Sequence, residues 1–98
     1  MLAAFSVTPL GGGDSVSGPV AEAVRIVRES GLPNETNAMF TNLEGEWDVV
    51  MGVIKQCVDK IAEAAPRVSV VIKLDYRPGH DDTIHSKVAA VERRLGDG

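Results

Sequence analysis

The chain has 98 residues, 44% of them hydrophobic, and its ten basic and fourteen acidic side chains give a net charge of −4 at pH 7. This length predicts a single domain over residues 1–98, with a modest core because a chain of this size buries only ~60 to 70% of its unfolded surface. The apolar runs are far shorter than the ~20 residues that span a bilayer, which excludes a membrane-spanning chain. No cluster of Lys and Arg is interleaved with aromatic residues, which argues against nucleic acid as a partner.

The first segment, Met1 to Pro9, alternates along the chain and predicts a strand. It lacks the basic flank and the cleavage site of a signal peptide, so we expect the protein to stay in the cytoplasm. The only cysteine, Cys57, has no partner for an internal disulfide. It falls within a helical apolar pattern, which favours a buried thiol over a reactive one.

A glycine-rich turn follows the first strand and leads to a predicted helix over Val16–Ser30, which Gly31 ends. The segments Asn34–Met39 and Thr41–Glu46 then predict two strands paired as a hairpin. A second helix is predicted over Trp47–Ala64, because large apolar residues recur there at helical spacing. This stripe comprises Trp47, Val50, Ile54, Cys57, Val58 and Ile61.

Pro66 ends the second helix, and alternating β-branched residues predict a last strand over Val68–Asp75. After a loop over Arg77–Asp82 comes a short third helix, whose apolar stripe comprises Ile84, Val88, Val91 and Leu95. The order βαββαβ followed by a helix is that of ferredoxin-like α+β proteins with a four-stranded antiparallel sheet. Both main helices would lie on one face of the sheet. The other face is too apolar to leave open to water, so we expect a second subunit, a ligand or both to cover it.

Several possible sites are better explained as ordinary structure. Gly11–Ser15 precedes a helix but lacks the Lys of a P-loop, so we interpret it as a turn with a Ser cap rather than a phosphate cradle. His80 and His85 are five apart, which does not set two imidazoles on one side of a helix, so no metal site is predicted. No nucleophile with a neighbouring base is evident, so no catalytic residue is predicted. Trp47 is interpreted as the first core anchor of its helix rather than as a ligand platform.

A series of different short motifs covers most of the chain. They are Phe5-Ser6-Val7-x-Pro9-Leu10-Gly11, Ser15-Val16-Ser17, Ala21-Glu22-Ala23-Val24, Glu29-Ser30-Gly31-Leu32, Met39-x-Thr41, Glu44-Gly45-Glu46-Trp47-Asp48 and Arg67-Val68-Ser69-x-x-Ile72-Lys73-x-Asp75. In this order and spacing the chain resembles the thiamine-binding protein family from Met1 to about Leu95. The resemblance implies a ferredoxin-like fold, assembly into a homodimer or homotetramer through the sheets, and binding without catalysis of thiamine or its hydroxymethylpyrimidine part. That molecule would be a ligand, and no cofactor is implied.

The candidate ligand-binding residues are Ser6, Ser17, Asn37, Met39, Thr41 and Lys73. Ser6 and Lys73 should point to the uncovered sheet face, and Asn37 should share one side of the second strand with Met39. Together they could line a small polar pocket that matches the donors and acceptors of an aminopyrimidine ring. The alternative is that these residues fill a subunit interface, with Lys73 paired to an acid. Ser17 is either a helix cap or a ligand contact.

Three functions therefore compete. The first is a non-enzymatic carrier or sensor for thiamine or its pyrimidine. The second is a ferredoxin-like amino-acid sensor of the ACT type, in which the Gly11–Gly13 loop would meet a neighbouring subunit, although the Glu-Gly-Glu-Trp-Asp block is foreign to that class. The third is a cofactor-free enzyme of the dimeric α+β barrel kind, which lacks a clear base on a strand. The sequence favours the first.

Overall fold

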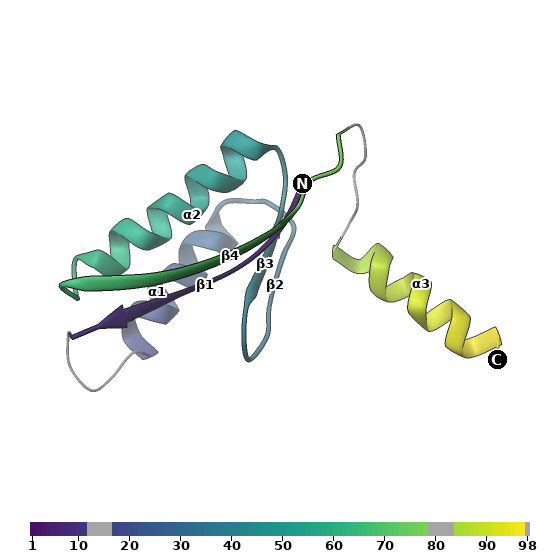
Figure 1. Ribbon diagram of the computed structural model, residues 1–98, viewed down its shortest axis with the longest axis horizontal. Helices are drawn as coiled ribbons and strands as arrows, with labels where there is room; N and C mark the ends of the chain where they lie inside the picture. Colours follow the sequence, from purple (N-terminus) through teal and green to yellow (C-terminus); the bar gives the residue numbers. More distant parts are fainter. Residues whose placement is uncertain (12–16, 79–83, 98) are drawn as a thin grey trace.

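The structure is a computed structural model that describes residues 1–11, 17–78 and 84–97. Its elements in chain order are β1 (Leu2–Leu10), α1 (Ser17–Glu29), β2 (Asn34–Thr36), β3 (Thr41–Glu44), α2 (Trp47–Ala62), β4 (Arg67–Asp75) and α3 (Ile84–Asp97). The strands form one antiparallel sheet in the order β2-β3-β1-β4 (Figure 1). The predicted ferredoxin-like order with a C-terminal helix is confirmed. Over the described ranges, no helix combines the length and the apolar character needed to cross a membrane.

The core lies between the sheet and the two helices that cover one of its faces, α1 and α2 (Figure 1). Alternate residues of β1 point into it, because successive side chains of a strand face opposite sides. Ala3 and Phe5 of β1 pack with Val27 of α1 and Leu43 of β3. Helix α2 contributes Val50, Val53, Ile54, Cys57 and Ile61. The predicted helical stripe is thus largely buried.

Cys57 joins the two helices, since its Sγ donates a hydrogen bond to the carbonyl oxygen of Ala23 over 3.4 Å. Its side chain is fully buried, as the sequence predicted. Burial raises the pKa of the Cys57 thiol from 9.0 to about 11, because the thiolate would lose its hydration. The thiol therefore stays protonated at neutral pH and acts as a small apolar side chain.

The β2–β3 hairpin is shorter than predicted. Strand β2 ends at Thr36, strand β3 begins at Thr41, and residues 37–40 form the turn between them. The N–H of Asn37 donates to the carbonyl oxygen of Phe40, and Oδ1 of Asn37 accepts the N–H groups of Met39 at 2.8 Å and of Phe40 at 2.9 Å. Asn side chains commonly form such local turns. The prediction that Asn37 and Met39 lie in a strand is therefore wrong.

Trp47 is not the core anchor that the sequence predicted, since 46% of it is exposed. The backbones of Met1 and Gly45 exchange hydrogen bonds at the end of the sheet, so Trp47 lies beyond the last pair of strand residues. The burial of α2 begins instead at Val50. Trp47 packs edge-on against Tyr76, with ring centroids 5.9 Å apart.

The first turn of α3 contacts β3 through Glu44 and β4 through Asp75. The helix then extends away from the rest of the chain (Figure 1). Glu44, which is 7% exposed, accepts the N–H of Ile84 at Oε1 over 3.1 Å. Lys87 pairs with Asp75 and holds the pKa of that carboxyl below its usual value. The stripe predicted for this helix is present, but beyond Ile84 it is open to solvent, since Val88, Val91 and Leu95 are 59%, 57% and 71% exposed.

Two predicted connections lie largely outside the described residues. They are the glycine-rich turn after β1, which falls on residues 12–16, and the loop before α3, which falls on 79–83 and includes His80.

Candidate functional site

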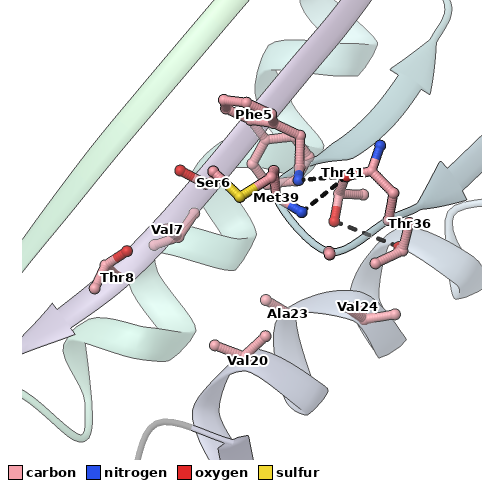
Figure 2. A pocket seen from close by; sticks show the side chains of 13 residues that line it. Phe5, Ser6, Val7, Thr8, Val20, Ala23, Val24, Thr36, Met39 and Thr41 are labelled. Atoms are coloured by element: carbon pink, nitrogen blue, oxygen red, sulfur yellow. Dashed lines mark hydrogen bonds between the residues drawn. The ribbon is translucent and has the colours of Figure 1, made fainter.

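A pocket of about 200 Å³ lies where β1, α1 and the tip of the β2–β3 hairpin meet (Figure 2). It exists because strand β3 is shorter than its neighbour: β3 pairs with β1 only from Leu2 to Phe5, whereas β4 pairs with β1 as far as Leu10. Beyond Phe5 one edge of β1 is therefore bare. The lining residues are Phe5, Ser6, Val7, Thr8, Val20, Ala23, Val24, Thr36, Asn37, Ala38, Met39, Phe40 and Thr41.

The polar side chains of the pocket come from β1 and from the hairpin. Ser6 is half-buried, and its hydroxyl has no hydrogen-bond partner among the described residues. The hydroxyls of Thr36 and Thr41 lie 3.4 Å apart across the hairpin (Figure 2). Because Oδ1 of Asn37 is occupied by the turn, its Nδ2 is the group left to donate to a ligand. The lining thus carries four hydroxyls, those of Ser6, Thr8, Thr36 and Thr41, and one amide donor.

Part of the apolar lining comes from α1, where Val20, Ala23 and Val24 face the pocket (Figure 2). Met39 lies opposite on the hairpin tip and is 74% exposed, so its flexible thioether is free to move against a bound ring. Among the described residues, no lining residue is acidic, basic or a histidine. This part of the lining is therefore neutral, and recognition there would depend on hydrogen bonds and apolar contact.

The structure brings together four of the predicted site residues, Ser6, Asn37, Met39 and Thr41, in this one pocket. Lys73 does not join them. It lies on β4, on the far side of β1 from the hairpin, and lines a separate hollow of about 350 Å³ on the open sheet face. Its predicted grouping with the others is wrong, because alternation fixes the face on which a side chain lies but not its neighbours. Ser17 is the first residue of α1, and its side chain lies outside the described part.

Several lining residues were not predicted from the sequence, among them Val20, Val24, Thr36 and Phe40. Val20 and Val24 belong to the apolar pattern of the first helix and were assigned to the core, although only Ala23 and Val27 of that pattern are buried. The available signal was that Val20 lies near the start of α1, where few neighbours remain to cover it.

The Glu44–Asp48 block lies away from the pocket and has a structural role. Glu44 accepts a hydrogen bond from the first residue of α3. Its negative charge also interacts favourably with the positive end of the helix dipole. Its second oxygen, Oε2, is buried without a hydrogen-bond partner in the described chain. A Cβ at Gly45 would meet side-chain atoms of Leu32 and Val50 at 3.3 Å, so glycine suits this close packing.

Comparison with protein families decides the assignment that the motifs suggested: the family described as thiamine-binding protein matches residues 3–92. The chain belongs to the thiamine-binding protein family. The resemblance drawn from the sequence motifs is confirmed.

Relatives of this thiamine-binding family member cover nearly its whole length. A UPF0045 protein of Mycobacterium bovis is 57% identical over 96 residues, which are 97% of this chain and 94% of the relative. A solved structure of a hypothetical protein from Methanocaldococcus jannaschii is 35% identical, with a TM-score of 0.84 over 93% of this chain and 94% of the other. A domain of unknown function, DUF77, from Bacillus cereus is 38% identical, with a TM-score of 0.81 over 89% and 85%.

Proposed function

We propose that the protein is a non-enzymatic carrier or sensor that binds thiamine or its hydroxymethylpyrimidine part, with the pyrimidine ring in the pocket between β1, α1 and the hairpin. One observation carries the proposal. In a member of the thiamine-binding protein family, residues from segments far apart in the sequence, Ser6 and Asn37–Thr41, converge on one small neutral pocket.

The chemistry of the lining suits an aminopyrimidine. Such a ring has an amino donor and nitrogen acceptors at its edge, which hydroxyls and an amide can match. Its faces and methyl group are apolar and suit Val20, Val24 and Met39. The volume of about 200 Å³ is below the ~300–1,000 Å³ of typical ligand pockets, which favours one ring rather than two. The described lining residues include no acidic group that could pair with the cationic thiazolium ring, which we expect to lie outside.

The same lining supports binding rather than conversion. General acid–base catalysis needs a titratable group within hydrogen-bond reach of the reacting atom, and a serine nucleophile needs a neighbouring base. Ser6 has no such base among the lining residues. The neutral lining also disfavours the amino-acid-sensing alternative, because a free amino acid carries an ammonium and a carboxylate that both require partners when buried.

Isothermal titration calorimetry with hydroxymethylpyrimidine, thiamine, its phosphates and free amino acids tests the proposal. We expect heat with the pyrimidine and thiamine, and none with amino acids. Ser6→Ala should weaken binding about five- to a hundredfold, since a ligand group left buried and unpaired costs ~1 to 3 kcal/mol. Ser69→Ala is the matched control, because Ser69 lies on the same face but on β4 and outside the pocket.

The two failures are separate. No heat with any pyrimidine-bearing ligand would reject the function, whereas equal affinities for Ser6→Ala and the parent would reject only the site. Asn37→Ala is a poorer test than Ser6→Ala. Its Oδ1 closes the hairpin turn, so this change should lower stability as well as affinity.

A further inference from the structure

The bare edge of β1 presents backbone groups to the pocket, and the hydrogen bonds of the sheet show which ones. At the start of β1 the terminal amine of Met1 donates to the carbonyl oxygen of Gly45 over 2.9 Å, and the N–H of Gly45 donates back to the carbonyl oxygen of Met1 over 3.1 Å. In an antiparallel ladder such mutual pairs occur at every second residue. The odd-numbered residues of β1 therefore direct N–H and C=O toward β3, and the even-numbered ones toward β4.

Val7 is the first odd-numbered residue past the end of β3. The register that pairs Phe5 with Thr41 would set Met39 opposite Val7. The N–H of Met39, however, donates to Oδ1 of Asn37 and so does not bond Val7. No hydrogen bond joins Val7 to the hairpin in the described chain. Its N–H and C=O thus lie side by side, unpaired, in the lining of the pocket.

Pro9 indicates how long this open edge is. It is the next odd-numbered residue and has no N–H, and proline is tolerated in a sheet where that group would face away from a partner strand. The edge therefore offers one complete donor and acceptor pair, at Val7. A strand from another chain would need several such pairs in succession. A single planar ring needs only one.

We propose that the backbone of Val7 reads the edge of the aminopyrimidine ring, its N–H donating to a ring nitrogen and its C=O accepting from the adjacent amino group. This inference rests on the proposed function. An adjacent acceptor nitrogen and amino donor are the pair that an amide group recognises bidentately on adenine. Held this way, the ring extends the plane of the sheet, with one face against Val20 and Val24 of α1.

The ligand arm of the test is calorimetry with 5-hydroxymethyl-2-methylpyrimidine, which lacks the 4-amino group, beside the 4-amino compound. Deletion of the amino group leaves the C=O of Val7 without a donor. We expect the deaminated compound to bind the parent protein about five- to a hundredfold more weakly. Equal affinity of the two compounds would overturn the inference.

The protein arm removes the donor. Val7→Pro deletes the N–H that faces the pocket and should leave the β1–β4 ladder intact, as Pro9 does. Val7→Ala is the matched control, because it keeps the N–H and shortens the side chain instead. We expect Val7→Pro to lose about five- to a hundredfold in affinity for the 4-amino compound relative to Val7→Ala.

A second variant guards against misfolding of Val7→Pro. Chemical ligation at Cys57 permits a full-length chain in which an ester replaces the amide at position 7, so that the N–H becomes an oxygen and the valine side chain stays. A comparable loss of affinity supports the inference. If parent, proline and ester proteins bind alike, the reading by Val7 is overturned and the proposed function stands. If the parent binds no pyrimidine, both are overturned.

Discussion

Trp47 shows how the position of a residue at the end of an element governs its burial. Trp47 fits the helical stripe of α2, but the sheet ends at the Met1–Gly45 pair, two residues before it. The indole therefore remains 46% exposed. Leu43, four residues earlier on β3, is fully buried between the sheet and the helices. The larger and rarer side chain is therefore not the one that holds the core together.

The two residues allow a direct comparison of stability. Trp47→Ala should cost about 1 to 2 kcal/mol, since it loses an edge-on aromatic contact and the half-burial of a surface side chain but leaves no core cavity. Leu43→Ala should cost ~2 to 5 kcal/mol, because it leaves a cavity in the core. Urea unfolding followed by circular dichroism measures both. A larger loss for Trp47→Ala than for Leu43→Ala would show that Trp47 is the core anchor after all.

Some pocket residues could be placed from the local sequence pattern, and others could not. Ser6 lies in a strand with clear alternation, so its face could be predicted, and Thr41 follows because it opens β3. Asn37 and Met39 were misplaced because a side-chain hydrogen bond from Asn37 competes with the ladder and ends the strand. The unpaired N–H and C=O of Val7 could not be predicted from the sequence. They depend on where the partner strand ends and not on the identity of the residue.

At the scale of elements, periodicity predicted the helices and the long strands. The bounds of the short strands and the exposure of α3 depend instead on contacts with other elements. Helix α2 and strand β4 agree with their predicted bounds to within two residues, because their patterns are long. Strands β2 and β3 are too short to carry a pattern. Helix α3 was predicted from its stripe, but the stripe did not reveal that only Ile84 would find cover in the same chain.

The attachment of α3 depends on Glu44, whose Oε1 accepts the N–H of Ile84. Glu44→Ala removes that acceptor and leaves a donor at the helix start unpaired, so we expect faster amide hydrogen exchange over the first turns of α3. Exchange within α2 should not change. Glu46→Ala is the control, because Glu46 is exposed and makes no side-chain capping bond. Unaltered exchange of α3 in Glu44→Ala would mean that other contacts hold the helix.

At the scale of the whole molecule, two apolar surfaces are left uncovered by the residues that the structure describes. One is the open face of the sheet, where Val71 is 52% exposed beside half-buried Leu2 and Ala4. The other is the stripe of α3. The radius of gyration of 15.1 Å exceeds the ~13 Å of a compact chain of this length, in keeping with a helix that extends from the body. Ser6 pairs with Val71 in the sheet, so a cover over this face would also border the pocket.

We therefore expect the protein to be at least a dimer at micromolar concentration, with the open sheet face inside the contact. Burial of apolar area contributes roughly 25 cal/mol per Å², which favours covering both surfaces at once. Multi-angle light scattering should give twice the chain mass or more, and Val71→Glu should shift it toward the monomer because a charge would be buried without a partner. Ala90→Glu adds the same charge on α3, off its apolar stripe, and should leave the mass unchanged. A monodisperse monomer from the parent chain would contradict the prediction.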